Sequence, residues 1–309
     1  MPNKPTTMLR VAISAAVLLG ALAVSVVVVG QPSSAGSGPL GLPNPVSISA
    51  VRYGAPPLRV LLVGDSLAGS LGVGLGDMAA AYNVKLVNAG KPGCTMSMDG
   101  VILLTYTVNA PGAPCVLNQP DRLLATWKSW VDAYRPDVVL YVGRGDLLNQ
   151  VIHHQWTYIG HLHFNQWFLS RLDAGIGVLG SRGAKVVLMT VPVSQQNTLN
   201  PRPEDSPRRS GRDGKLLRIA AAGHADASVY DLGELLTPGL TYRSSAQGVS
   251  LRCVDGVHVT AEAGMVVAAD LYPRLWALVG SSRVPGGGGW VGGGVPPTTP
   301  RWWQKLNCT

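Results

Sequence analysis

Charged side chains are scarce in this chain of 309 residues, because only 14% are Asp, Glu, Lys or Arg, and aromatic residues make up only 6%. The charge is also unbalanced: 25 Lys and Arg stand against 17 Asp and Glu, which leaves a formal net charge of +8. The hydrophobic content of 46% excludes a disordered protein and is sufficient for a core. The positive excess suits a neighbourhood of anionic lipid, acidic wall polymer or nucleic acid, and does not choose among them.

Cysteines are also few, and none forms the CxxC spacing typical of a zinc site. The four are Cys94, Cys115, Cys253 and Cys308. Cys94 and Cys115 are the closest pair in sequence and are the predicted disulfide, although four cysteines allow three complete pairings. Disulfides persist in oxidising compartments, so these cysteines fit a protein outside the cytoplasm. No metal site is predicted.

Charge is missing altogether from one stretch near the N-terminus. Residues 11–29 are uncharged and mostly apolar, and they follow Lys4 and Arg10. As a helix they would span about 28 Å, close to the hydrocarbon thickness of a bilayer. Residues 1–30 are therefore predicted to be a single-pass membrane anchor, or a signal peptide cleaved near Ala35. In both cases the rest of the chain lies on the extracytoplasmic face or is secreted.

Gly-, Pro- and Ser-rich segments separate this predicted anchor from the rest. Residues 31–57 are interpreted as a linker, and residues 281–309 as a low-complexity Gly, Pro and Trp tail. The intervening residues 58–280 show no internal repeat and are predicted to form one domain.

Short apolar runs alternate with helical patterns in that domain, which favours an α/β fold: a three-layer α/β/α sandwich around a five-stranded parallel sheet. Predicted strands are 59–63, 85–88, 137–142, 185–191 and 227–231; predicted helices are 120–134, 165–180, 214–222 and 260–279.

The first predicted strand ends in Gly64-Asp65-Ser66-Leu67. In open parallel sheets, functional groups gather at the carboxyl ends of strands, so Ser66 would stand at the turn into a helix. The helix N-terminus offers N–H groups to a developing oxyanion. This motif alone is weak, because Asp-Ser is also an ordinary helix cap.

A second group of reactive side chains lies just before the final predicted helix. Asp255 and His258 are three residues apart, so one turn can bring carboxylate and imidazole together. A serine hydroxyl needs a base to remove its proton, and the base needs a partner that orients it. Ser66, His258 and Asp255 are therefore the predicted nucleophile, base and orienting acid. Taken alone, the Asp255–His258 segment would be interpreted as an Asx-turn with a capping histidine.

These motifs, in this order over about residues 59–279, resemble those of the SGNH, or GDSL, hydrolases. The first is Gly64-Asp65-Ser66-Leu67, the second runs from Asn88 to Thr95, and the last is Asp255-Gly256-Val257-His258. The resemblance implies a flavodoxin-like SGNH fold and an ester-cleaving activity. It also implies that the backbone N–H groups of Ser66 and Gly93 donate to the oxyanion.

The third motif departs from the family pattern. The family usually has Gly-x-Asn-Asp after its third strand, whereas this chain has Gly143-Arg144-Gly145-Asp146. The Asn side chain completes the family's oxyanion hole, so Gly145 leaves it one donor short. Arg144 supplying the charge, a hole made of backbone donors alone and a low activity all remain open. A similar replacement is familiar in SGNH domains that accompany bacterial membrane acyltransferases, which directs the substrate prediction to O-acyl groups on envelope sugars.

Asp65, Asp146 and Trp156 are the predicted substrate contacts. Four histidines surround Trp156 in sequence, and they are interpreted as lining of a substrate groove or as a surface loop, with a metal site the weakest interpretation because no carboxylate accompanies them. Residues 195–214 are predicted to be a solvated polar loop, with a rim of the active site as the alternative. Their arginines are too mixed with proline and acids to predict nucleic-acid binding. The four histidines are His153, His154, His161 and His163.

The sequence thus predicts an exported, serine-dependent carboxylic-ester hydrolase or O-acyl (acetyl) transferase acting on acylated cell-envelope glycan or lipid. It is expected to be a monomer that needs no cofactor. The alternative is a catalytically weak glycan-binding module on the same fold, which Gly145 favours and the complete Ser66–His258–Asp255 set disfavours.

Overall fold

The structure is a computed structural model and describes residues 51, 54–97, 102–104, 107–109, 120–197, 199, 201–280 and 308. The predicted membrane anchor and nearly all of the predicted linker and tail lie outside these residues and stay predictions. Within the described part of the chain, no helix combines the length and the apolar character needed to cross a bilayer.

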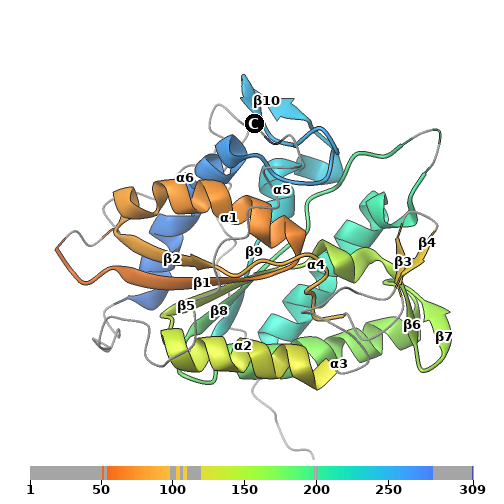
Figure 1. The fold of residues 1–309 in the computed structure, drawn as a ribbon, viewed down its shortest axis with the longest axis horizontal. Helices are drawn as coiled ribbons and strands as arrows, with labels where there is room; N and C mark the ends of the chain where they lie inside the picture. The colour runs from red at the N-terminus through yellow and green to blue at the C-terminus, as the bar shows by residue number, and fades with distance from the viewer. Residues whose placement is uncertain are drawn as a thin grey trace, which may run out of the picture. The chain divides into compact units, whose positions relative to one another are not determined.

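A five-stranded parallel sheet forms the centre of the fold, in the order β2-β1-β5-β8-β9 (Figure 1). This confirms the predicted α/β fold class, and each of the five predicted strands is present. The prediction extended the fourth strand two residues too far, because β8 ends at Met189. The strands are β1 (Leu58–Gly64), β2 (Val84–Asn88), β5 (Val138–Val142), β8 (Lys185–Met189) and β9 (Ala227–Tyr230).

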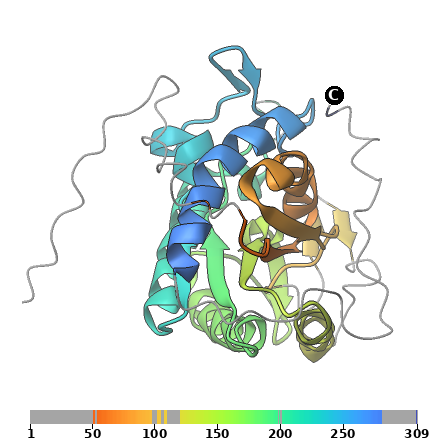
Figure 2. The same ribbon diagram turned by 90° about the vertical axis from the view of Figure 1, so that its left-hand side faces the viewer.

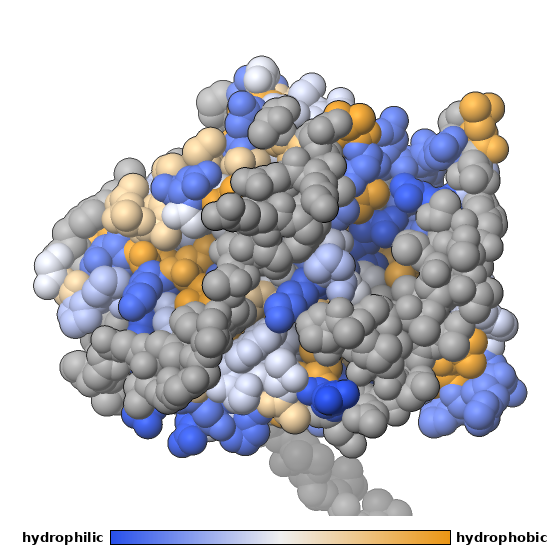
Figure 3. All heavy atoms as spheres, viewed as in Figure 1, coloured by the Kyte–Doolittle hydropathy of each residue, from blue (hydrophilic) through white to orange (hydrophobic). Residues whose placement is uncertain are grey.

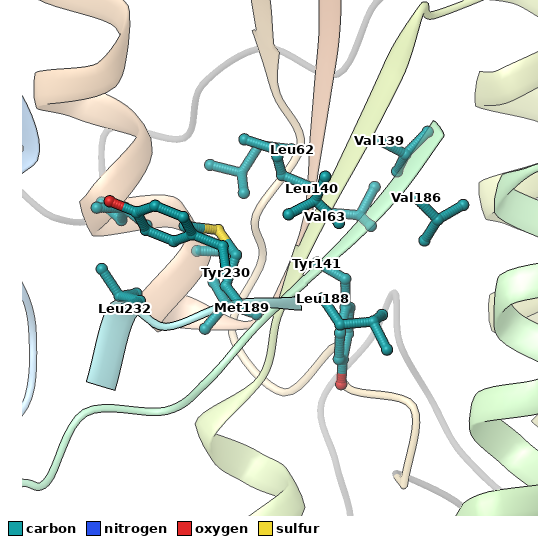
Figure 4. Packing of buried hydrophobic residues seen from close by; sticks show 14 of the residues in the cluster. Leu62, Val63, Val139, Leu140, Tyr141, Val186, Leu188, Met189, Tyr230 and Leu232 are labelled. Carbon is teal, nitrogen blue, oxygen red and sulfur yellow. The ribbon is translucent and has the colours of Figure 1, made fainter. Parts of the chain in front are cut away.

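Every residue of β1 and β5 is buried, which explains why both strands are apolar except at Arg59, whose charge is paired with Asp137. Leu62 on β1 is paired with Leu140 on β5, and Tyr141 on β5 is paired with Leu188 on β8, so the two pairs lie on opposite faces of the sheet (Figure 4). Burying each such side chain contributes about 1.5–3 kcal/mol. The buried side chains therefore stabilise the sheet, and the ends of its strands are where functional groups can reach the surface.

Helices cover both faces of the sheet (Figures 1 and 2). α1 and α6 pack against each other on one face, and α2, α3 and α4 lie side by side on the other. This arrangement follows from right-handed crossovers in a sheet whose strand order reverses beside β1. The helices are α1 (Ser66–Ala79), α2 (Pro120–Tyr134), α3 (Leu162–Leu179), α4 (Pro207–Ala222), α5 (Leu232–Leu236) and α6 (Ala261–Val279).

The predicted solvated loop at 195–214 is wrong in its second half. α4 begins at Pro207, because proline is favoured in the first turn of a helix and Ser206 precedes it in an extended conformation. Glu204, Asp205 and Arg209 are buried rather than solvated. The first half of the helix was not predicted because it is rich in Pro, Gly and charged residues, some of which are buried in the folded protein.

A second sheet, absent from the prediction, is antiparallel and has the order β4-β3-β6-β7. β6 follows β5 closely in the chain, so this sheet extends from the carboxyl end of the parallel strands (Figure 1). Its strands are too short to show a clear alternation. They are β3 (Ile102–Leu104), β4 (Thr107–Asn109), β6 (Asn149–Ile152) and β7 (Gln155–Thr157).

On the described part of the face in Figure 3, hydrophobic residues form small separate areas among hydrophilic ones.

The remaining elements are short. A two-stranded hairpin pairs β10 (Ser245–Ala246) with β11 (Val249–Ser250). Single 3-10 turns are η2 (Ala80–Tyr82), η3 (Arg144–Leu147), η4 (Pro203–Asp205) and η5 (Pro238–Leu240).

Candidate active site

Ser66 is the first residue of α1, at the turn that follows β1. Gly64 makes this turn possible: its φ is +137°, and a Cβ there would lie 1.9 Å from the carbonyl oxygen of Val142 on the neighbouring strand. Asp65 caps the helix, because its Oδ1 accepts a hydrogen bond of 2.8 Å from the N–H of Leu67. Ser66 is half-buried and therefore reachable from solvent.

Asp65 also joins this turn to the third motif. Its Oδ2 accepts a hydrogen bond of 2.7 Å from the N–H of Gly145. Burial raises the pKa of Asp65, although bonds from Gly145 and Leu67 and the charges of Arg144 and His258 act in the opposite direction. Only 4% of Asp65 is exposed. These bonds give Asp65 a positioning role, and its predicted contact with substrate stays a prediction.

Asp255 and His258 form the pair that their spacing predicts. Oδ2 of Asp255 lies in a short hydrogen bond with Nδ1 of His258, and Oδ1 accepts bonds of 2.9 and 3.0 Å from the N–H groups of Val257 and His258. Burial acts to raise the pKa of Asp255, but the bond and charge of His258 and these N–H groups outweigh it and hold that pKa at about 2. Asp255 is a carboxylate that orients the ring, and the nitrogen directed elsewhere is Nε2.

The loop that carries His258 is docked on the first turns of α1. The N–H of Val259 donates to Oγ of Ser70 at 3.3 Å, and Ser70 lies one helical turn after Ser66. Further along, the hydroxyl of Tyr272 on α6 donates to the carbonyl of Leu75 on α1 at 2.6 Å. The charge of His258 reaches Asp65 strongly enough to act on its pKa. The structure thus brings the first and last motifs, nearly two hundred residues apart, to one end of α1.

The second motif lies beside the same turn. The N–H of Lys91 donates to the carbonyl of Gly64 at 3.0 Å, and the N–H of Cys94 closes a turn on the carbonyl of Lys91 at 3.1 Å. Gly93 sits inside this turn with φ of +77°, a conformation that glycine adopts without strain. Gly93 is partly exposed, and no other heavy atom lies within 4 Å of where a Cβ would stand, but its predicted role as an oxyanion donor stays a prediction.

The third motif holds the site through buried polar contacts. Arg144 donates from Nε to Oγ of Ser194 at 3.0 Å, and its Nη2 forms a short ion pair with Asp205. Because Nε and Nη2 of Arg144 already bond to Ser194 and Asp205 in the segment after β8, the structure does not support the predicted contribution of Arg144 to an oxyanion hole. The side chain instead ties η3 to that segment.

Asp146 is likewise buried and engaged. It accepts hydrogen bonds of 2.5 Å from the hydroxyl of Tyr141 and 3.0 Å from the N–H of Ser97. Burial raises its pKa to about 6, against those bonds. Because Asp146 is only 1% exposed, these contacts give it a structural role and do not support the predicted contact with substrate.

Sequence reasoning missed Gln150, Ser70 and Asp205. Gln150 on β6 donates from Nε2 to Oγ of Ser97 at 2.6 Å and lies 3.3 Å from the carbonyl of Gly145. Neither Gln150 nor Ser70 stands in a recognisable motif, and Asp205 lies in the segment interpreted as solvated. Each acquires its role from a neighbour distant in sequence, so no local signal could identify it.

Trp156 lies outside this arrangement, on the β6–β7 hairpin. It is 49% exposed and lines a pocket of about 920 Å³ together with His153, His161 and His163. Three of the four histidines therefore line a hollow, and a role for it in substrate binding stays a prediction. Within the described residues no three His, Cys, Asp or Glu side chains are grouped as a metal ion would require.

The disulfides differ in how far the structure tests them. Cys253, two residues before Asp255, is bonded to Cys308. Cys94 is disulfide-bonded, while its predicted partner Cys115 lies outside the described residues. None of the described cysteines is free. One disulfide therefore links the loop that carries Asp255 and His258 to Cys308 near the end of the chain.

A parallel α/β sandwich with Ser66 at the first strand end and an Asp255–His258 pair docked on the helix that follows has the architecture of an esterase or acylhydrolase. The family model described as the SGNH domain, fused to AT3 domains, matches residues 40–273. The chain belongs to the SGNH family, which confirms the resemblance drawn from its motifs.

Solved structures with a similar fold are distant in sequence. A GDSL-like lipase from Bacteroides thetaiotaomicron is 14% identical, with a TM-score of 0.45, over 72% of this chain and 91% of that one. The esterase EstA from a Pseudoalteromonas species is 17% identical, with a TM-score of 0.43, over 69% and 94% of the two chains. No curated protein gives a significant match.

Proposed function

We propose that this protein is an exported, serine-dependent carboxylic-ester hydrolase or O-acyl transferase that acts on acylated glycan or lipid of the cell envelope. The observation that carries the proposal is the Asp255–His258 pair, held by Val259 and Ser70 against the helix that begins with Ser66. Membership of the SGNH family supports ester chemistry.

The first half-reaction forms an acyl-enzyme. Oγ of Ser66 attacks the ester carbonyl while Nε2 of His258 takes the hydroxyl proton, and Asp255 offsets the charge of the imidazolium. The tetrahedral intermediate collapses, the C–O bond to the alcohol breaks, and His258 returns the proton to the departing alcohol. The acyl group is left on Ser66.

The second half-reaction distinguishes the two activities. His258 removes a proton from water or from a sugar hydroxyl, whose oxygen attacks the acyl-Ser66 carbonyl. Collapse of the new intermediate breaks the bond to Ser66, and His258 returns the proton to Oγ. Water as the acceptor releases a carboxylic acid, and a sugar hydroxyl yields a new ester.

The oxyanion would be held by the backbone N–H groups of Ser66 and Gly93. Gly145 brings no side chain to this place, and its own N–H donates to Asp65. Loss of one oxyanion donor commonly costs about 2.7–4 kcal/mol of transition-state stabilisation. We therefore expect slower turnover than a hole with three donors would give.

Four features support an envelope substrate. The matching family model describes SGNH domains fused to AT3 domains. Residues 1–30 have the pattern of an anchor or signal peptide, and the net charge of +8 suits an anionic surface. Cys253 and Cys308 form a disulfide, as an oxidising compartment permits.

The test is turnover of p-nitrophenyl acetate by the full chain and by Ser66→Ala. We expect Ser66→Ala to lose the activity by about 10³-fold or more, and a fluorophosphonate probe to label only the protein that retains Ser66. Ser129→Ala, which changes an exposed serine on α2, is the matched control and should keep the wild-type rate. Equal rates in the wild type and Ser66→Ala would refute the hydrolase proposal.

The second candidate is a catalytically weak glycan-binding module on this fold. Gly145 in place of the family's Asn favours it. Binding of envelope glycan with no Ser66-dependent turnover and no fluorophosphonate labelling would support this candidate over the first.

A further inference from the structure

The pocket beside Trp156 is separate from the residues of the proposed catalytic site, since neither Ser66, Asp255 nor His258 lines it. Its walls come from the β6–β7 hairpin and the start of α3. At about 920 Å³ it lies at the upper end of ligand-pocket sizes and is far larger than one acetyl group requires. The lining residues are Ile152, His153, Gln155, Trp156, Thr157, Gly160, His161, Leu162, His163, Gln166 and Trp167.

The chemistry of this lining selects the ligand. None of these lining residues is Asp, Glu, Lys or Arg, so the pocket offers no fixed charge to an ionic ligand. Trp156 and Trp167 supply flat apolar faces, while Gln155 and Gln166 supply amide donors and acceptors. A sugar ring has the matching combination of apolar C–H faces and neutral hydroxyl groups around its edge.

The hairpin is braced by its neighbours. His153 and His154 form its tight turn, with φ of 49° and 66°, where glycine or asparagine would be favoured. The rings of His161 and Tyr158 are in tilted contact with centroids 3.8 Å apart, and the guanidinium of Arg209 on α4 lies 4.2 Å from the centroid of the same tyrosine ring. Arg209 also donates to the carbonyl of Leu147 at 2.6 Å. These contacts hold the chain on both sides of the hairpin that carries the exposed Trp156.

The pocket also lies within reach of the proposed active site. Gly145 is bonded to Asp65 beside Ser66, and Ile152 of the pocket follows seven residues later. Seven extended residues span at most about 25 Å. A small ester bound at Ser66 would not fill both places, whereas a chain of several sugars could.

We propose that this pocket, here called the hairpin pocket, is a sugar-binding subsite that holds an uncharged oligosaccharide next to the proposed ester-cleaving site. The role of the subsite rests on the proposed function, because the subsite would position the glycan part of an acylated polymer for ester cleavage. Its binding test does not require turnover.

The test is a titration of Ser66→Ala with cello-, chito- and xylo-oligosaccharides of two to six sugars, followed by tryptophan fluorescence and calorimetry. We expect saturable binding by at least one series and about tenfold weaker binding when Trp156→Ala is added. Ile219→Ala is the matched control, because Ile219 is a similarly exposed apolar residue, at 58%, on α4 and outside the pocket. This control should bind as the parent does.

Two outcomes would overturn the subsite: no binding in any series, or equal binding with and without Trp156. A third outcome would overturn it by identifying an acyl-binding site instead. In that case Trp156→Ala, made in the protein that retains Ser66, would lower turnover of p-nitrophenyl decanoate and leave oligosaccharide binding unchanged. Turnover of p-nitrophenyl acetate should be the same in Ile219→Ala and wild type. If the wild type did not turn over p-nitrophenyl acetate at all, the proposed function would be refuted. The oligosaccharide-binding result would still decide the subsite.

Discussion

At the scale of single residues, Asp255 and His258 illustrate how position in a short loop controls ionisation. The carboxylate accepts two backbone N–H bonds and contacts the imidazole, which keeps its pKa at about 2. Asp65 and Asp146 are also carboxylates near the site, but burial raises the pKa of each. The same side chain therefore serves as an orienting anion in one place and as a buried polar connector in the other two.

Asp255→Asn should lower kcat for p-nitrophenyl acetate by about 10⁴-fold with little change in KM, because the ring would lose both its orientation and the charge that offsets the imidazolium. Steady-state kinetics would measure this. Asp226→Asn, an exposed carboxylate paired with Lys185, is the control and should keep the wild-type rate. A loss of less than tenfold in Asp255→Asn would contradict the assigned role.

Asp146 gives a prediction for stability against pH. Its folded-state pKa of about 6 lies above the ordinary value of 3.8, so the folded protein holds this proton more tightly than the unfolded chain. The stabilising contribution is complete below about pH 4 and is lost as the pH rises through about 6. Asp146→Asn should remove this part of the decline in Tm between about pH 4 and 7, as measured by calorimetry.

The control for that experiment is Asp132→Asn. Hydrogen bonds from Lys128 and Arg182 lower the pKa of Asp132, so its loss should leave the decline between about pH 4 and 7 in place. Identical pH profiles for wild type and Asp146→Asn would show that Asp146 does not carry a raised pKa.

At the scale of elements, the loop before α6 is held at several points. Val259 bonds to Ser70 on α1, and the N–H of Gln195 donates to the carbonyl of Gly256 at 2.9 Å. The Cys253–Cys308 disulfide adds a covalent link at the start of the loop. These contacts come from three different segments, so the position of His258 depends on the assembled fold.

Cys308→Ser should lower the free energy of unfolding by about 2–4 kcal/mol, because the cross-link restricts the unfolded chain. It should also lower kcat by loosening the loop that carries His258. Denaturant unfolding and steady-state kinetics would measure the two effects. Mutation is preferable to a reductant because Cys94 is disulfide-bonded as well.

Val254→Ala is the matched control for that variant, since Val254 is the exposed neighbour of Cys253. It should change neither stability nor rate. Wild-type stability in Cys308→Ser would exclude the disulfide as a constraint on the loop.

At the scale of the whole molecule, the parallel sheet lies at the centre of the buried apolar core and the candidate site occupies one end of it. Leu140 lies on the central strand β5 and is fully buried. Leu140→Ala should cost about 2–5 kcal/mol of stability through lost burial and a residual cavity. Leu199→Ala, at 95% exposure, should change stability by less than about 0.5 kcal/mol in the same denaturant titration.

The sequence by itself determined the parallel sheet and the proposed catalytic residues. Strands buried on both faces have mostly apolar sequences, so Leu58–Gly64, apart from Arg59, and Val138–Val142 can be predicted from the sequence. Gly64, Ser66 and the Asp255–His258 spacing are also local patterns, since each depends on residues within one turn or loop.

The tertiary structure alone decided the roles that depend on distant neighbours. Asp65 and Asp146 became buried connectors through Gly145 and Tyr141, and the charged segment before α4 became interior through the Arg144–Asp205 pair. The β6–β7 hairpin was not predicted either, although lining of a groove was one interpretation of the histidines around Trp156. Burial and pairing between segments far apart in the chain have no periodic signature, so only the assembled fold reveals them.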